Sequence, residues 1–411
     1  MKVSGSIIAY FFSIILGINF LTTILVYPQK FEELAATPPM GWNSWNHFAC
    51  DVNEKLIMEI ADAMVSTGMK DAGYIYINID DCWHGKRDSL GFIHPDPERF
   101  PSGMKELADY VHFKGLKLGI YSCAGSKTCA GYPGSRGHEY QDAISYASWG
   151  IDYLKYDWCN SENLNPIGSY TTMRDALYSA GRPIVFSLCE WGTNKPWEWG
   201  AEVGHLWRTT GDIYNCFDCI IDHGTWKQLG VLQILDLQDG LRKYASPHHW
   251  NDPDMMEVGN DLTANENRAH FSMWCMLAAP LISGNDLRNM PQDVIKVLTN
   301  KGVIAIDQDT LGIQGFEYSS KDNVEVWFKP LANGDWAMCI LNRYKDEKNI
   351  SFDFKNENVV DNLWMKSPDF KNTNYTIKNL WTNSDMGTTI RALSESIPGY
   401  DVLMLRLIKK K

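Results

Sequence analysis

The chain has 411 residues, of which 45 % are hydrophobic, and a formal net charge of −12 at pH 7. This length and composition suffice for a large core and for more than one domain. The acidic balance argues against nucleic acid and against an anionic membrane as partners, and it is compatible with a neutral substrate such as a sugar. The 16 tryptophans weakly favour carbohydrate, because indole rings stack on the apolar face of a pyranose.

The N-terminus has the pattern of a targeting segment. Lys2 supplies a positive charge, and Ile7 to Tyr27 is nearly all apolar. We predict a signal peptide within residues 1–36, cleaved near Val26 to Ala36, and therefore export to the periplasm or the extracellular space. The apolar run is as long as a membrane span, so an uncleaved anchor is the alternative. With the signal cleaved, we expect no stable membrane association.

Strand and helix patterns alternate between residues 37 and 314. Apolar runs that turn polar at their C-terminal ends predict strands at 40–45, 74–79, 117–122, 153–156, 183–188, 205–207, 249–254 and 280–283. Helical spacing follows these runs, for example at 53–68, where Asn53 can act as the N-cap, at 226–244, and finally at 291–298. Eight such units across about 270 residues predict an α/β fold, the (β/α)8 TIM barrel. A doubly wound sheet is less favoured, because the first strand is not followed by a glycine-rich loop.

The pattern changes from residue 315 onward. Val324 to Lys329, Trp336 to Asn342 and Ile350 to Phe354 alternate with period two, and Asn333-Gly334 is a hairpin turn signal. Residues 315–411 are therefore predicted to form a C-terminal antiparallel β-sandwich domain. We expect it to pack against the barrel rather than to bind sugar as a lectin does.

Carboxylates gather where the predicted barrel strands end, namely at Asp80, Asp81, Asp157, Glu190, Asp212 and Asp254. One of them alone could cap a helix, but several like charges at one rim repel one another unless they are used. Divalent metal binding and glycoside hydrolysis are the two common uses. The interleaved aromatic residues, Trp45, Trp83, Tyr121, Trp158 and Trp191, favour a sugar. We predict no metal and no organic cofactor.

Asp157 and Asp212 are the carboxylates most suited to catalysis. Asp157 ends the apolar strand at 153–156, and Lys155 lies two residues earlier, so both side chains should point into the barrel. The charge of Lys155 is expected to lower the pKa of Asp157 and keep it ionised, although a purely structural ion pair is also possible for this lysine. Arg208 precedes Asp212 by four residues and should reach the same ligand.

The ten cysteines suit an exported protein with disulfides. Cys50, Cys82, Cys129 and Cys159 each follow a predicted strand end and so lie on one rim, but spacing alone does not pair them. Cys216-Phe-Asp-Cys219 has the spacing of half a zinc site. Because no second such motif exists, a structural thiol pair is favoured.

Together these motifs resemble family 27 of the glycoside hydrolases, the α-galactosidase or melibiase family. The resemblance runs from Pro38 to about Gly312 and, more loosely, through the sandwich. The matching motifs are Pro-Pro-Met-Gly-Trp-Asn-Ser-Trp (38–45), Asp-Asp-Cys-Trp (80–83), Lys-Tyr-Asp-Trp-Cys (155–159), Cys-Glu-Trp-Gly (189–192), Trp-Arg (207–208) before Asp212, and Trp-Asn-Asp-Pro-Asp-Met (250–255).

The resemblance implies a role for each site residue. Asp157 would be the nucleophile and Asp212 the general acid/base of a retaining double displacement. The substrate-binding residues would be Trp45, Asp80, Asp81, Tyr121, Lys155, Glu190, Trp191, Arg208 and Asp254, with Asp80 and Asp81 on the O4 and O6 side, Glu190 and Arg208 at the 2-position, and Asp254 bracing the reacting end. The family's usual disulfides map onto Cys50–Cys82 and Cys129–Cys159. Cys189 has no evident partner.

The implied activity is hydrolysis of terminal non-reducing α-D-galactosyl residues from galacto-oligosaccharides, galactomannan side chains or glycoconjugates. The bulky Glu190 favours a free 2-hydroxyl over N-acetylgalactosamine, and the intact Asp80–Asp81 pair favours galactose over β-L-arabinopyranosides. These two activities are the alternatives within the family. The rival from another class is a non-catalytic carbohydrate-binding protein, which would lack Asp157 or Asp212.

Overall fold

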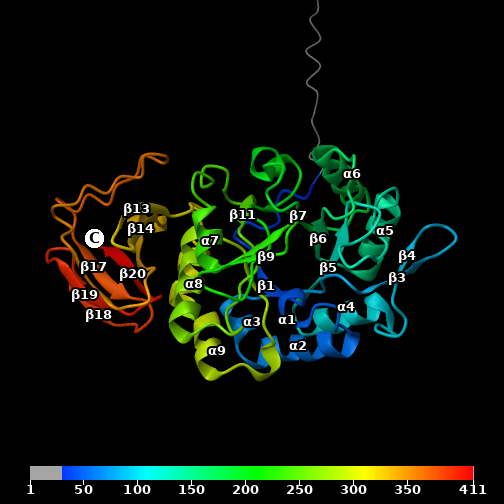
Figure 1. The fold of residues 1–411 in the computed structure, drawn as a ribbon, viewed down its shortest axis with the longest axis horizontal. Coiled ribbons are helices and arrows are strands. Elements are labelled where there is room, and N and C mark those ends of the chain that lie inside the picture. Colours follow the sequence, from blue (N-terminus) through cyan, green and yellow to red (C-terminus); the bar gives the residue numbers. More distant parts are fainter. Residues whose placement is uncertain (1–29, 411) are drawn as a thin grey trace, which may run out of the picture.

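The computed structural model describes residues 30–410, which form a barrel and a smaller β domain beside it (Figure 1). Eight parallel strands build the barrel in the order β11-β8-β7-β6-β5-β2-β1-β12. They are β1 (Met40–Asn43), β2 (Tyr76–Asn78), β5 (Lys117–Cys123), β6 (Tyr153–Asp157), β7 (Val185–Cys189), β8 (Leu206–Arg208), β11 (Trp250–Asp252) and β12 (Leu281–Ser283). A parallel bridge between Met256 and Ser283 joins the segment after β11 to β12 and closes the ring. The predicted TIM barrel is confirmed.

Helices surround the barrel, and several carry caps that the sequence supplies (Figure 1). They include α2 (Glu54–Ser66), α4 (Gly103–Phe113), α5 (Glu139–Trp149), α6 (Pro166–Ser179), α8 (Ala264–Leu277) and α9 (Gln292–Leu298). As predicted, Asn53 caps α2, where its side chain accepts a hydrogen bond from the N–H of Leu56. Thr263 and Glu266 form a capping box on α8.

Three segments differ from the prediction. The stretch 226–244 was expected to be largely helical, but it begins inside an antiparallel hairpin of β9 (Ile220–Asp222) and β10 (Lys227–Leu229), and its helix α7 (Val231–Asp236) has only six residues. The hairpin turns at Gly224, whose φ of +86° suits glycine. A further helix, α10 (Lys301–Asp307), follows the one expected to be last. A hairpin of β3 (His84–Arg87) and β4 (Ile93–Pro95) was not predicted.

The C-terminal domain consists of antiparallel strands, as predicted. One sheet has the order β13-β14-β15-β20-β17-β18, and β16 pairs with β19. These strands are β13 (Phe316–Lys321), β14 (Val324–Pro330), β15 (Trp336–Asn342), β16 (Lys348–Phe352), β17 (Tyr375–Asn379), β18 (Asp385–Thr388), β19 (Leu393–Ile397) and β20 (Val402–Lys409). The domain lies beside α8 (Figure 1), and there the buried Lys329 donates a hydrogen bond from Nζ to the carbonyl of Cys275 at 2.9 Å.

Residues 30–36 pack against the barrel at the end where its strands begin. Leu34 and Ala35 lie against Tyr76 and Trp250, and the Trp250 indole donates a hydrogen bond to the Ala35 carbonyl at 2.7 Å. Residues 30–36 therefore contribute to the packing of the barrel. The predicted apolar segment from Ile7 to Tyr27 lies outside the described residues. Within residues 30–410, no helix combines the length and the apolar character needed to cross a membrane.

Candidate active site

A cavity of about 750 Å³ opens where the carboxyl ends of the barrel strands meet. This volume suits a small ligand. All the predicted catalytic and substrate-binding residues except Glu190 line its wall, namely Trp45, Asp80, Asp81, Tyr121, Lys155, Asp157, Trp191, Arg208, Asp212 and Asp254. The barrel thus brings together side chains that are more than 200 positions apart in the sequence.

One part of the wall holds a charged pair. Lys155 Nζ lies 2.8 Å from Oδ2 of Asp80, which also accepts a hydrogen bond from the Asn43 side-chain amide at 2.7 Å. Burial lowers the pKa of Lys155, but the neighbouring anions, Asp80 foremost, outweigh it and hold this pKa above its usual value. Asp81 accepts a hydrogen bond from the N–H of Ala130 at 2.8 Å, and burial raises its pKa. These fixed groups can accept and donate hydrogen bonds to hydroxyls of a ligand.

Asp157 ends β6 and is buried. Its Oδ1 accepts a hydrogen bond from the N–H of Trp158 at 2.8 Å, and a carboxylate oxygen lies within 4.8 Å of the Sγ atoms of Cys129 and Cys159. Burial raises the pKa of Asp157 to about 7, and Lys155 opposes that rise only in part. The expectation that Lys155 keeps this pKa low is therefore wrong, because desolvation disfavours the charged form more than the lysine favours it.

Asp212 and Asp254 share the guanidinium group of Arg208. Nη2 of Arg208 lies 3.1 Å from Oδ1 of Asp212 and 2.8 Å from Oδ2 of Asp254. Asp254 also accepts a hydrogen bond from the N–H of Ile213 at 2.9 Å, so it holds the backbone directly after Asp212. Burial raises the pKa of Asp254 to about 6 in spite of Arg208. Its φ of +91° is unusual for a non-glycine residue, as is common where a fold holds a functional group in place.

Glu190 is fully buried and does not line the cavity. Its Oε2 accepts hydrogen bonds from the backbone N–H and the side-chain amide of Asn194, both at 2.7 Å, while Oε1 has no hydrogen-bond partner within residues 30–410. Burial raises the pKa of Glu190 to about 7. The structure thus places Glu190 behind the loop that carries Trp191, rather than on the wall where a residue reading the 2-position was expected.

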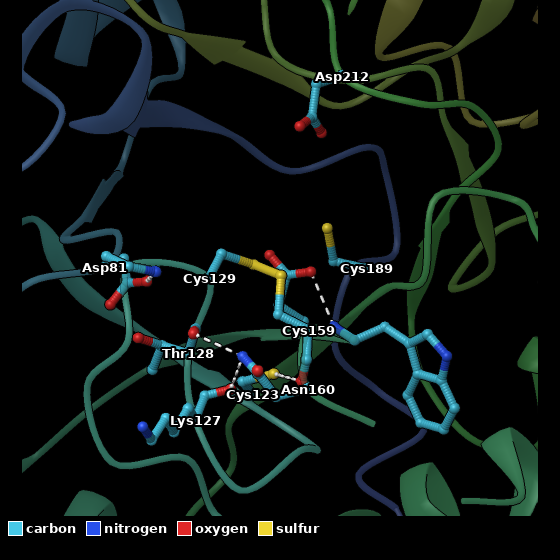
Figure 2. The surroundings of a disulfide bond; sticks show 12 residues. Asp81, Cys123, Lys127, Thr128, Cys129, Cys159, Asn160, Cys189 and Asp212 are labelled. Carbon is cyan, nitrogen blue, oxygen red and sulfur yellow. Dashed lines mark hydrogen bonds between the residues drawn. A yellow bond between two sulfur atoms is a disulfide. The ribbon is translucent and has the colours of Figure 1, made fainter. Parts of the chain in front are cut away.

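The two predicted disulfides, Cys50–Cys82 and Cys129–Cys159, are confirmed. Figure 2 shows the Asp212 carboxylate turned toward the Cys129–Cys159 disulfide and the Cys189 thiol. The Asn160 side chain donates hydrogen bonds to the carbonyls of Lys127 and Thr128, at 3.2 and 3.1 Å, which holds the loop before Cys129 against the end of β6 (Figure 2). This disulfide therefore fixes part of the wall next to Asp157.

The other cysteines are also accounted for. Cys216 and Cys219 form a third disulfide, which agrees with the structural pair favoured over a metal site. Cys189, for which no partner was predicted, is a free and buried thiol, as are Cys123, Cys275 and Cys339. Cys129, Asp157 and Cys159 are close enough to share a metal ion, but the disulfide removes the thiolates that such an ion would need.

Part of the wall escaped sequence reasoning. Thr225, Trp226, Lys227 and Gln228 line the cavity from the turn and second strand of the β9–β10 hairpin. The sequence predicted a largely helical stretch at 226–244, which gave Trp226 no role in the site. Gly224, just before this stretch, was a signal for a turn, because glycine marks turns and loops.

The assembled groups suit one sugar ring. Carboxylates can accept hydrogen bonds from hydroxyl groups, and Lys155 and Arg208 can donate hydrogen bonds to sugar oxygens. The half-buried Trp45 and Trp191 offer apolar surface to a pyranose. Two carboxylates on one wall, Asp157 and Asp212, are the groups that cleavage of a glycosidic bond requires.

Comparisons with known proteins identify α-galactosidases as relatives over most of the chain. A family model described as alpha galactosidase A matches residues 37–309, and one described as the alpha galactosidase C-terminal beta sandwich domain matches residues 321–407. Alpha-galactosidase A of Cellvibrio japonicus is 56 % identical over 398 residues, which cover 96 % of this chain and 98 % of that protein.

Solved structures show the same fold. Alpha-galactosidase I from Mortierella vinacea has a TM-score of 0.85 at 34 % identity, covering 92 % of this chain and 98 % of that one. The alpha-galactosidase of Saccharomyces cerevisiae, solved with raffinose, has a TM-score of 0.84 at 30 % identity, covering 94 % and 100 %. Because two family models match both domains and these relatives share the fold over most of their length, the chain belongs to the α-galactosidases of glycoside hydrolase family 27.

Proposed function

We propose that the protein is a retaining exo-glycosidase that removes terminal non-reducing α-D-galactosyl residues by double displacement. One observation carries this proposal: Asp157 and Asp212 line the same cavity, and the Asp212 carboxylate is turned toward the disulfide against which Asp157 lies (Figure 2). The relatives named above are α-galactosidases, and the yeast structure was solved with raffinose, which supports a galactoside as the substrate.

The reaction follows from the two carboxyl groups. Asp212 gives its proton to the glycosidic oxygen as the bond from that oxygen to the anomeric carbon breaks, and the Asp157 carboxylate bonds to that carbon from the opposite face. The product of this step is a β-galactosyl ester and a free alcohol. Asp212 then takes a proton from water, whose oxygen displaces Asp157 and releases galactose in its original α-configuration.

The remaining wall holds the galactose ring. Asp80 and Asp81, with Lys155 beside them, accept and donate hydrogen bonds at the O4 and O6 side, while Trp45 and Trp191 contact the apolar face. Arg208 reaches the reacting end, where it is fixed between Asp212 and Asp254. Preformed charges of this kind stabilise the transition state without reorganising during the reaction.

The natural substrates would be galacto-oligosaccharides, galactomannan side chains or galactose-bearing glycoconjugates, met after export. The three disulfides support an oxidising location.

A parallel assay tests the proposal. The nitrophenyl glycosides of α-galactose, α-N-acetylgalactosamine and β-L-arabinopyranose are hydrolysed side by side, and proton NMR follows the first anomer released. We expect the galactoside to be hydrolysed fastest, to release α-galactose first, and to be inert to the Asp157→Asn variant. Initial release of β-galactose would contradict the double displacement. Preference for another sugar would contradict the assignment of the galactose-binding wall, and activity in Asp157→Asn would contradict the nucleophile.

A further inference from the structure

Glu257 is a buried carboxylate behind the cavity wall. It lies in the loop after β11 and is 2 % exposed, and it does not line the cavity, whereas the nearby Asn46 and Met255 do. Its two oxygens accept hydrogen bonds from different segments: Oε1 from the side-chain amide of Asn46, and Oε2 from that of Asn260 at 2.6 Å. Glu257 therefore links the loop after β11 to the segment after β1.

The position of Glu257 is fixed by its own backbone. Its N–H donates a hydrogen bond to Nε2 of the buried His270 at 3.0 Å, and its carbonyl accepts one from the N–H of Asn260 at 2.9 Å. Burial lowers the pKa of His270 to about 3, so this imidazole stays neutral and can accept. The Asn260 amide also lies 3.3 Å from the carbonyl of Gly284. The carboxylate thus points at Asn46 from a rigid support.

The surroundings of Glu257 disfavour its charged form. Burial, aided by the anions Asp254 and Asp261, raises its pKa to about 7, although the two amides oppose the rise. An apolar side chain of the same length would avoid this desolvation. A carboxylate kept in such a place beside a ligand cavity indicates a functional task.

The segment that Glu257 contacts is α1 (Trp45–Phe48), a single helical turn that begins with Trp45. None of its four residues is fully buried, so polar contacts do much to hold it. The N–H of Trp45 donates to Oδ1 of Asn43 at 2.8 Å, and the side-chain amide of Asn43 donates to Asp80 at 2.7 Å. The first residue of α1 is thereby joined to the galactose-binding wall.

Asn46 supplies a further polar contact for this turn, through its hydrogen bond to Glu257. Its side chain has little room to move, because a Cβ atom added to Gly284 would lie only 3.2 Å from the Cβ atom of Asn46. Trp45 is therefore held through two carboxylates, Asp80 on one side of it in the sequence and Glu257 on the other.

We propose that Glu257 is a positioning residue of the reaction: by holding Asn46 it fixes the Trp45 indole where the galactose ring packs against it. This inference rests on the proposed function, in which Trp45 contacts the apolar face of galactose. An apolar contact acts on bound substrate and transition state alike. Loss of the Glu257 carboxylate should therefore weaken galactose binding more than it slows the chemical step.

The substitution Glu257→Met tests this role, because methionine keeps the length of the side chain and removes both acceptors. We expect the Ki of free galactose and the KM for the nitrophenyl α-galactoside to rise together by about 10-fold, while kcat falls by less than about threefold. Ki describes the folded molecules alone, so a merely structural role would not change it. Glu257→Gln should restore most of the affinity, since its amide can still pair with both asparagine amides.

Two further variants locate the effect. Asn46→Ala should also raise Ki, and adding Glu257→Met to it should raise Ki no further, because the carboxylate acts through Asn46. Glu325→Met is the matched control. Glu325 is also 2 % exposed, but it lies in the C-terminal domain, where it accepts a hydrogen bond from the Trp327 indole at 2.9 Å. Its loss should lower the melting temperature and leave Ki unchanged.

The results distinguish this role from the proposed function. An unchanged Ki in Glu257→Met, or an equal rise in Ki from Glu257→Met with and without Asn46→Ala, would overturn the positioning role while leaving the α-galactosidase intact. A wild-type protein that neither hydrolyses the galactoside nor binds galactose would overturn the proposed function itself, and the positioning role with it.

Discussion

Lys155 gives its ion pair to Asp80 and not to Asp157: its Nζ lies 2.8 Å from Oδ2 of Asp80. The ammonium group still lowers the pKa of Asp157, but it does so from a position fixed by another carboxylate, and burial outweighs it. Asp157, the proposed nucleophile, is therefore a poorly solvated carboxyl group whose pKa is raised to about 7. That value, rather than the ordinary value of an aspartate, should govern activity in acid.

The first prediction concerns how activity falls at acidic pH. Asp157 must be ionised to attack, and its pKa in the folded protein is raised to about 7, so kcat/KM for α-galactosyl fluoride should fall as the pH drops through about 7. The fluoride is suitable because its leaving group needs little help from an acid. A profile of kcat/KM against pH measures the fall, and an inflection near pH 4, the ordinary range of an aspartate, would contradict the prediction.

The second prediction separates the roles of the two carboxylates by chemical rescue. Asp157→Gly should lower activity on a dinitrophenyl α-galactoside by at least about 10³-fold, and azide should restore turnover by attacking the anomeric carbon directly, which yields β-galactosyl azide. Asp212→Gly should still form the ester on Asp157, so azide should yield α-galactosyl azide. Product NMR distinguishes the two, and the same anomer from both variants would be incompatible with double displacement.

The third prediction contrasts the two partners of Arg208. Asp254 is buried, whereas the Asp212 side chain is 41 % exposed. Asp254→Asn removes a charge from a buried ion pair and should lower the free energy of unfolding by about 3 kcal/mol. Asp212→Asn should abolish activity while lowering stability by no more than about 1 kcal/mol. Urea unfolding measures the stability of both variants. Equal losses of unfolding free energy in the two variants would contradict a mainly structural role for Asp254 and a mainly catalytic role for Asp212.

The fourth prediction concerns the disulfides. Cys129 and Cys159 are separated by 30 positions and Cys216 and Cys219 by three. From loop closure alone, replacing the first pair with serine should lower the free energy of unfolding by about 3–4 kcal/mol, and replacing the second pair by about 1–2 kcal/mol. The first replacement should also reduce hydrolysis of α-galactosyl fluoride, because this disulfide lies against Asp157. Full fluoride activity in that variant would show that the disulfide does not position the nucleophile.

The fifth prediction concerns the N-terminus of the mature chain. Lys30 Nζ donates a hydrogen bond to the Gly204 carbonyl at 2.9 Å, and Ala35 accepts one from Trp250, so residues 30–36 belong to the folded barrel. The proposed signal peptide should therefore be cleaved before Lys30, and mass spectrometry of the mature protein can identify its first residue. A chain starting at residue 30 should unfold at the same temperature as the exported protein, and one starting at residue 37 should unfold several degrees lower. Equal melting of both would contradict a structural role for this segment.

Much of the fold was predictable because its signals are local. Apolar strands that end in carboxylates, and helices opened by residues such as Asn53, specify the alternating units, and closure of the ring follows from having eight of them. Most of the cavity wall was predictable for the same reason, since its side chains lie at or just after strand ends and parallel strands end at one rim.

What could not be predicted depends on contacts between distant segments. Apolar spacing after Lys227 suggested a helix, but pairing with β9 and the disulfide at Cys216 make a hairpin of its first residues. Strand alternation predicts that Lys155 points into the barrel, but it does not determine whether the ammonium group pairs with Asp80 or with Asp157. The burial of Glu190 likewise arises from the Asn194 loop, whose course the sequence does not reveal.

The Cys129–Cys159 disulfide determines when a newly made chain can become fully active. The loop before Cys129 is joined to the strand end that carries Asp157 by a bond that only oxidation can make. A newly made chain with reduced thiols has both carboxylates but lacks the covalent link that fixes the wall next to Asp157. The appearance of full activity would then be set by the chain's first contact with an oxidant and not by the completion of its synthesis.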